Sequence, residues 1–155
     1  MSQINKLRYS ANISNDTKVD AFAIGLFSDL KLDKDIKNFD KSVGKAISNS
    51  IESKLFDGSK DQIKIVPTNN SKVILLYGLG KRDELSSERI RRAGGLISKT
   101  AISNKIGSLS VVFPFKTEDD YLHQSFAEGI VLGSYQFNEL KTEDKKFDLK
   151  STTLV

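Results

Sequence analysis

Short, continuously apolar segments are the feature that most constrains the fold of this chain. Val73–Tyr77 carries only apolar residues, and Ser110–Phe113 and Val19–Phe27 are nearly as apolar. A strand that is covered on both faces has this pattern, whereas a half-exposed strand alternates between apolar and polar residues. The three segments are therefore predicted to be strands, and Val73–Tyr77 and Val111–Phe113 to be interior strands of a sheet that is covered on both faces.

Three stretches with helical periodicity lie between and after these strands. The first is predicted to begin at Asp40, which can cap it, and the second to run from about Ser87 to Asn104. The third follows Thr117 and has acidic residues in its first turn, where the helix dipole favours them. Apolar or small residues recur at steps of three and four: Val43, Ala46, Ile47, Ile51 and Leu55, then Ile90, Gly94, Ile97 and Ala101, then Leu122, Phe126, Ile130, Gly133 and Phe137.

The remaining segments complete an alternation of strands and helices. Gln62–Val66 alternates and is joined by a short turn to Val73–Tyr77, which predicts a hairpin. Asp29–Asn38 is predicted to be a loop, Lys6–Ser10 a weaker strand, and Phe147–Val155 a last strand or the start of a linker. The pattern predicts a single domain, residues 1–155, with an α/β fold and a mixed sheet.

Composition excludes several kinds of site. The 155 residues include no cysteine, so neither a disulfide nor a thiolate metal site can form. Lysine and arginine number 24 and acidic residues 20, and the lysines are spread along the chain rather than clustered as in nucleic-acid-binding proteins. The first residues lack the apolar run of a signal peptide, and no stretch is apolar enough to span a membrane. These features favour a cytoplasmic protein.

Gly78-Leu79-Gly80 lies between a buried strand and a helix, where a phosphate-binding loop would lie. A dinucleotide-binding fingerprint requires a third glycine at position 83, but Asp83 stands there, and its charge would repel a pyrophosphate. The P-loop pattern is not completed either. A tight structural turn is the favoured interpretation.

A basic cluster follows this turn, with Lys81, Arg82, Arg89, Arg91 and Arg92 interleaved with Asp83, Glu84 and Glu88. Glu88 and Arg92 are four residues apart, a spacing that lets opposite charges pair on a helix. The favoured interpretation is a solvated helix facing a neighbouring domain, and the alternative is an anion or nucleic-acid patch.

His123 is the only histidine of the chain. With Asp119 and Asp120 it could hold a metal weakly, but nitrogen-type metal sites use several ligands at short spacing. A surface histidine is therefore favoured. Ser134 lacks the flanking glycines of a nucleophile elbow. Gly129 and Gly133 are predicted to let the third helix lie close to the sheet.

Three motifs in this order resemble one family: Gly78-Leu79-Gly80-Lys81, then Arg91-Arg92-Ala93-Gly94-Gly95, then Glu128-Gly129 with Leu132-Gly133-Ser134-Tyr135-Gln136-Phe137. Together they resemble the N-terminal domain of the cytosolic leucyl aminopeptidases, the two-metal family. One departure is Leu140 before Lys141, where that family usually has an aromatic residue. The resemblance implies a three-layer α/β/α sandwich similar to macro domains.

The resemblance also implies a parent enzyme that is a homohexamer and removes N-terminal amino acids from peptides with two zinc or manganese ions. In that family the metal ligands and catalytic residues lie in a C-terminal domain, whereas this chain stops at Val155. We therefore expect no catalytic, cofactor-binding or metal-binding residue here, no activity of the chain alone, and the C-terminal catalytic domain of the same polypeptide as partner. Two alternatives are a macro-like module that binds ADP-ribose or a related nucleotide, and a nucleic-acid-binding domain that uses the cluster of residues 81–92.

Overall fold

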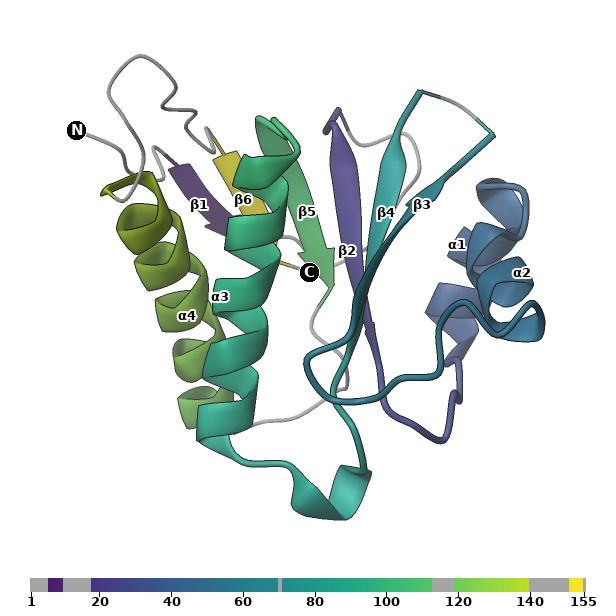
Figure 1. The fold of residues 1–155 in the computed structure, drawn as a ribbon, viewed down its shortest axis with the longest axis horizontal. Coiled ribbons are helices and arrows are strands. Elements are labelled where there is room, and N and C mark those ends of the chain that lie inside the picture. Colours follow the sequence, from purple (N-terminus) through teal and green to yellow (C-terminus); the bar gives the residue numbers. More distant parts are fainter. Residues whose placement is uncertain (1–5, 10–17, 70, 113–118, 140–150, 155) are drawn as a thin grey trace.

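The computed structural model describes residues 6–9, 18–69, 71–112, 119–139 and 151–154, and of residues 6–9, 136–139 and 151–154 the backbone only. The described strands form one six-stranded sheet with the order β1-β6-β5-β2-β4-β3 (Figure 1). Their bounds are β1 Lys6–Tyr9, β2 Ala21–Leu26, β3 Ile63–Pro67, β4 Val73–Gly78, β5 Ser108–Val112 and β6 Ser151–Leu154.

The sheet is mixed, as predicted. Parallel pairs run from β1 through β6, β5 and β2 to β4. The edge strand β3 runs antiparallel to β4, with Pro67 opposite Val73, which confirms the predicted hairpin. Both β4 and β5 are interior strands as predicted, although Phe113 lies outside the described residues.

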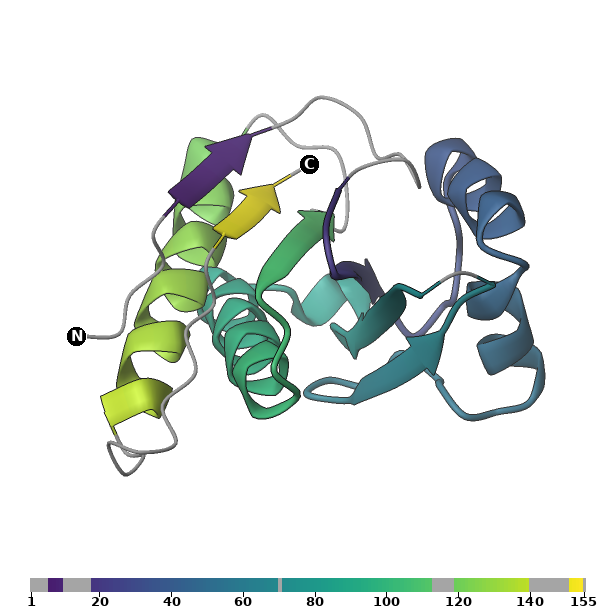
Figure 2. The same ribbon diagram turned by 90° about the horizontal axis from the view of Figure 1, so that it is seen from above.

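Helices cover both faces of the sheet, which gives three layers (Figures 1 and 2). The first pair, α1 (Lys34–Ser42) and α2 (Ala46–Glu52), packs on one face. The second pair, α3 (Ser87–Ser103) and α4 (Asp120–Glu139), packs on the other face, and a short 3₁₀ turn at Arg82–Glu84 precedes α3. The α/β/α sandwich is therefore confirmed.

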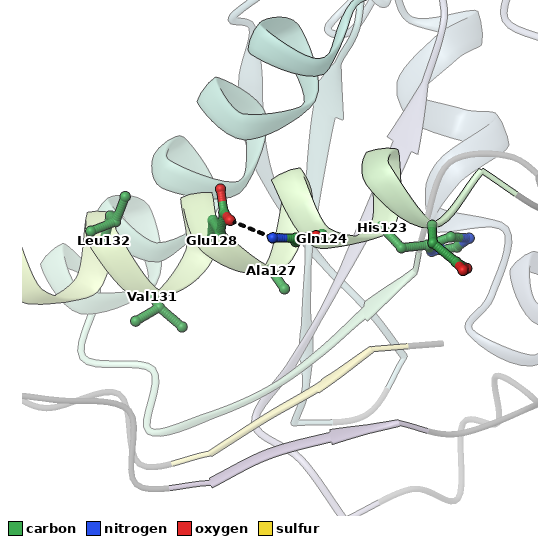
Figure 3. Close-up of a pocket in the computed structure, with 7 residues that line it drawn as sticks. His123, Gln124, Ala127, Glu128, Val131 and Leu132 are labelled. Carbon is green, nitrogen blue, oxygen red and sulfur yellow. Dashed lines mark hydrogen bonds between the residues drawn. The ribbon is translucent and has the colours of Figure 1, made fainter.

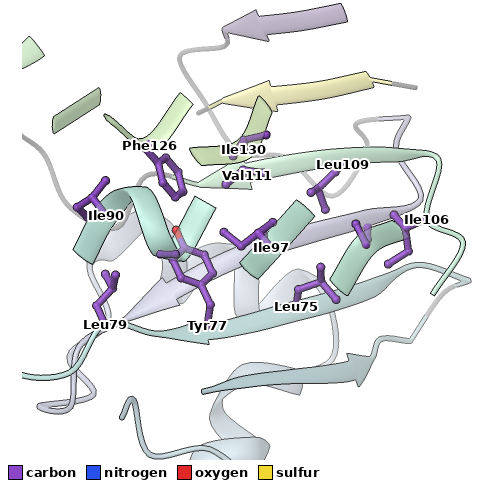
Figure 4. Close-up of a cluster of buried hydrophobic side chains, with 14 of the residues drawn as sticks. Leu75, Tyr77, Leu79, Ile90, Ile97, Ile106, Leu109, Val111, Phe126 and Ile130 are labelled. Carbon is purple, nitrogen blue, oxygen red and sulfur yellow. The ribbon is translucent and has the colours of Figure 1, made fainter. Parts of the chain in front are cut away.

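A hydrophobic core fills each space between sheet and helices. On the α3 side, Leu75 and Tyr77 from the sheet meet Ile97, Phe126 and Ile130 from the helices (Figure 4). The buried hydroxyl of Tyr77 donates to the carbonyl of Val112 at 2.7 Å, so it keeps a hydrogen-bond partner inside the core. Burial raises the pKa of this phenol. The core on the other face contains Phe22, Ile24, Phe39, Ile47, Ile74 and Leu76.

The region after β2 differs from the prediction. Half of the expected loop is helical, because Asp33 caps α1 by accepting a hydrogen bond from the amide of Ile36 at 2.9 Å. Asp40 does not begin a helix but lies within α1, and its buried carboxylate accepts from the amide of Ile47 at 2.8 Å. It thus caps α2 from the preceding helix. Gly44, with φ of 77°, separates the two helices.

The predictions for α3 and α4 are confirmed over the described residues. Helix α3 begins at Ser87, where Ser86 caps it, and Ile90, Gly94, Ile97 and Ala101 are all buried. In α4, Phe126 and Ile130 are fully buried as predicted. Thr117 and the side chain of Phe137 lie outside the described residues.

Candidate functional site

Helices α3 and α4 contact each other through glycine backbone. A β-carbon placed on Gly94 would lie 2.6 Å from the carbonyl oxygen of Phe126, and one placed on Gly133 would lie 2.6 Å from Cα of Gly95. A β-carbon on Gly129 would overlap the backbone of Arg91. The prediction that these glycines bring α4 close to the sheet is therefore wrong. They bring the two helices close to each other.

Polar side chains reinforce the same helix contact. The guanidinium of Arg91 on α3 donates to Glu128 of α4 at 3.4 Å and to Glu88 at 3.1 Å. The hydroxyl of Ser98 donates to the carbonyl of Ile130 at 2.6 Å. Glu88 therefore pairs with the residue three positions on, Arg91, rather than with Arg92 as predicted. We call Arg91, Glu128 and the glycines 94, 95, 129 and 133 the glycine crossing.

The hydrogen bonds that Arg91 donates raise the pKa of its guanidinium, first the one to Tyr121 and then those to Glu88 and Glu128. The group thus remains a cation that joins the helices. Sequence reasoning missed the partnership of Arg91 with Glu128, which stand 37 positions apart. The available signal was that both residues occur in the motifs that resemble the aminopeptidase family.

The glycine turn after β4 uses its amides within the fold. The amide of Gly78 donates to Gln62 at 2.8 Å, that of Leu79 to Leu26 at 3.0 Å and that of Gly80 to Gly58 at 2.8 Å. A phosphate-binding loop needs such amides free to point at the ligand. This geometry supports the structural turn and disfavours a nucleotide site built on residues 78–80.

The carboxyl ends of β2 and β4 are where open α/β sheets commonly bind ligands. Here the side chain of Arg82 forms an ion pair with Asp29 and lies over the ring of Phe27, 4.3 Å from its centroid. The hydrogen bond from Arg82 lowers the pKa of Asp29. The guanidinium of Arg82 is therefore already bound within the domain, at the carboxyl end of β2. With Arg91 also paired, at least two of the five cations in the predicted basic cluster have acidic partners.

His123 lies on α4 beside a shallow groove that is also lined by Asp120, Gln124, Ala127, Glu128, Val131 and Leu132 (Figure 3). Within the described part of the chain, no three or more histidine, cysteine, aspartate or glutamate side chains come together as a metal site would require. Asp119 caps the first turn of α4 by accepting from the amide of Tyr121 at 3.0 Å. The proposed grouping of His123, Asp119 and Asp120 therefore does not assemble as a metal site.

The N-terminal domain that characterises the cytosol aminopeptidase family matches residues 23–144. The chain belongs to this family. The match includes most of β2 and the whole of β4, β5, α3 and α4, and with them the whole glycine crossing. The motifs that carry the resemblance thus correspond in this structure to a contact between two helices.

Comparison with individual proteins agrees with this assignment. The chain is 30% identical over 132 residues to a probable cytosol aminopeptidase of Persephonella marina, covering 79% of this chain but 26% of that protein. The chain thus spans about a quarter of the length of this curated relative. No helix among the described residues has the length and apolar character to cross a membrane.

Solved structures share the fold. A mutant of tomato leucine aminopeptidase superposes with a TM-score of 0.80 at 19% identity, over 99% of this chain and 32% of that one. The macrodomain of Thermus aquaticus DarG superposes with a TM-score of 0.62 at 10% identity, and each chain covers 96% of the other. The likeness to macro domains is therefore confirmed for the fold.

Proposed function

We propose that this chain is a non-catalytic N-terminal domain of a cytosol aminopeptidase, an enzyme that removes N-terminal amino acids from peptides. The observation that carries the proposal is the family match over residues 23–144, together with the role of the matched motifs in joining α3 to α4. Among the described residues, these motifs build a packed layer of two helices.

The described residues do not fit a two-metal centre, which needs several ligands converging on ions a few ångströms apart. The acidic side chains Asp29, Asp40, Glu88 and Glu128 already accept hydrogen bonds or ion pairs within the domain. We therefore place the two zinc or manganese ions of the parent enzyme in the part of such a polypeptide that this chain does not include. On this proposal the chain alone has no peptidase activity.

The partner of the domain is then the C-terminal catalytic domain of the same polypeptide, within a homohexameric and cytoplasmic enzyme. The length of the matched relative supports this, since its remaining three quarters has room for a catalytic domain. The cytoplasmic location is supported by the word cytosol in the name of the family.

The experiment compares two polypeptides in the release of leucine from a leucyl amide with zinc or manganese. One is the 155-residue chain, and the other continues through the coding sequence downstream of Val155. We expect metal-dependent turnover only from the longer polypeptide. Turnover by the short chain, or none by a folded and metal-loaded long one, would contradict the proposal.

A further inference from the structure

Strand β3 is the outermost strand at one side of the sheet and pairs with β4 alone among the described strands (Figure 1). The carbonyl of Gln62 and the amide of Thr68 are hydrogen-bonded across the hairpin, at 2.8 Å and 3.3 Å. Since the backbone groups of successive residues in a strand point to opposite sides, the even-numbered residues of β3 face β4 and the odd-numbered ones face away. The amides and carbonyls of Ile63 and Ile65, and the carbonyl of Pro67, therefore point outwards, so that an additional strand can pair with them.

The side chains of β3 differ between the two faces of the sheet. Ile63 and Ile65 share the α3 side, where Ile63 packs against the core and Ile65 is 43% exposed. Lys64 and Val66 share the other side, where Val66 packs against the core formed with α1 and α2. A strand added beside β3 therefore has an apolar neighbour, Ile65, on one face and a cation, Lys64, on the other.

A groove of about 360 Å³ lies between β3 and α2. Val66 and Pro67 line it from the strand, and Ser53, directly after the helix, lines it from the other side. Leu55 also lines the groove and is 62% exposed. Side chains of an added strand that point to the α2 side can therefore reach both apolar and polar atoms of the groove.

The charge around this groove is positive. Segments 41–56 and 62–69, which supply its lining, contain four lysines and a single acidic residue, Glu52. Lys54 and Lys64 are exposed, and neither takes part in an ion pair with another described residue. An acidic partner is therefore attracted to this edge of the sheet, whereas a second copy of β3 would bring the same positive charge and be repelled.

We propose that the outward edge of β3 binds an extended acidic peptide segment of another protein as an additional strand, in which apolar and acidic side chains alternate. The main chain of the segment pairs with Ile63 and Ile65. Its apolar side chains cover Ile65 on the α3 side, and its acidic side chains reach Lys54 and Lys64 on the α2 side.

The size of this surface favours a peptide over a folded domain. The five residues of β3 extend about 17 Å, whereas interfaces between domains of one chain bury about 600–1,500 Å². Around β3 the exposed large apolar side chains of the described residues are only Leu55 and Ile65. The others lie on α4, away from β3 (Figure 2), and are Tyr121, Val131, Leu132 and Tyr135. A domain-sized partner, such as the catalytic domain, therefore has more apolar surface to bury on α4.

Binding of a designed peptide tests the main-chain pairing. The probe is a nine-residue peptide that alternates valine and glutamate, N-acetylated so that it is no aminopeptidase substrate and labelled with fluorescein at its C-terminus. Fluorescence anisotropy with the 155-residue chain should show saturable binding. Ile65→Pro removes an outward amide but no hydrogen bond to β4, a place where strands tolerate proline. It should weaken binding at least about tenfold relative to Ile65→Ala, which loses the side chain but keeps the amide.

A second pair of variants tests the charge without changing the backbone. Lys64→Glu should weaken binding of the probe, and Lys99→Glu, the same change of charge on α3, should not. A peptide that alternates valine and lysine should bind far more weakly than the probe, and added salt should weaken the binding of the probe. Circular dichroism and the urea midpoint of each variant report whether it is folded.

Four results would overturn the proposal. They are no saturable binding at about 1 mM probe, equal affinities of folded Ile65→Pro and Ile65→Ala, no effect of Lys64→Glu, and equal affinities for the acidic and the basic peptide. A polypeptide that continues past Val155 should bind the probe as tightly as the short chain. Loss of binding there would show that the parent's own chain covers β3, and would also overturn the proposal. All of these are binding measurements, so their outcome is separate from that of the aminopeptidase assay.

Discussion

Replacing Gly133 with leucine tests whether the glycine crossing holds the α3–α4 layer together. A β-carbon at this position would lie 2.6 Å from Cα, 2.7 Å from O and 3.1 Å from C of Gly95. All three neighbours are backbone atoms, so no flexible side chain can move aside. The first distance is about 1 Å inside the ~3.5 Å optimum for two carbon atoms, so the helices must separate.

The expected cost follows from two opposing terms. Overpacking of this kind costs about 1–3 kcal/mol, and the additional carbons of leucine place it in the upper half of that range. Replacing a helical glycine gains back about 1 kcal/mol of helix propensity. The net loss should be about 1–2 kcal/mol, which corresponds to a fall in Tm of roughly 2–8 °C for a domain of this size.

Denaturant unfolding of matched variants measures this loss. Gly95→Ala is the control, because its β-carbon would meet only the carbonyl oxygen of Gly129 at 3.6 Å, an ordinary contact. This variant should gain about 0.5–1 kcal/mol from the lower entropy of its unfolded chain and its better helix propensity. Equal midpoints for Gly133→Leu and the natural chain, or a loss in the control as large as that in the test variant, would refute a backbone contact between the helices.

Three further predictions concern other parts of the fold. Tyr77→Phe removes the hydrogen bond to Val112 and should lower the free energy of unfolding by about 1 kcal/mol, measured with urea. Because Arg82 lowers the pKa of Asp29 below its ordinary 3.8, this pair stabilises the fold above that pH and the contribution is lost as the pH falls through the lowered value. Acidification below pH 3.8 should therefore destabilise the Arg82→Met variant less than it destabilises the natural chain. The measurement is the Tm of each protein as a function of pH. Residues 81–92 should bind oligonucleotides only weakly and without sequence preference, since few phosphates can be neutralised at once, and a tight, sequence-selective complex near physiological salt would contradict this.

The elements that could be predicted are those with a long or unambiguous pattern. Helix α3 was predicted to within a residue because its buried apolar and small positions, from Ile90 to Ala101, recur over about three turns. The hairpin of β3 and β4 was predictable because an alternating and an apolar segment flank a short turn. Helix α1 was missed because Ile36 and Phe39 are its only apolar residues. Two apolar positions among polar and charged residues do not distinguish a short helix from a loop.

The candidate site was predictable only as a set of motifs. The sequence indicated that Gly129 and Gly133 pack closely, but the predicted neighbour, the sheet, was wrong, because periodicity does not identify the element that a helix face contacts. Arg82 was placed in a basic cluster, while its acidic partner Asp29 lies 53 positions earlier, in the segment predicted to be a loop. Pairings of this kind depend on the strand order, which local patterns do not determine.

The strand order also governs when the sheet can be completed. The last described strand, β6, lies between β5 and the first strand, β1, and β1 pairs with β6 and with no other described strand. During synthesis the strands β5, β2, β4 and β3 can associate as soon as they emerge, because their contacts involve residues already made. The first strand must wait for residues 151–154 and then join together with them, a contact that spans nearly the whole chain. One edge of the sheet therefore forms only after residues 151–154 have left the ribosome, and β1 is the strand whose partner is synthesised latest after it.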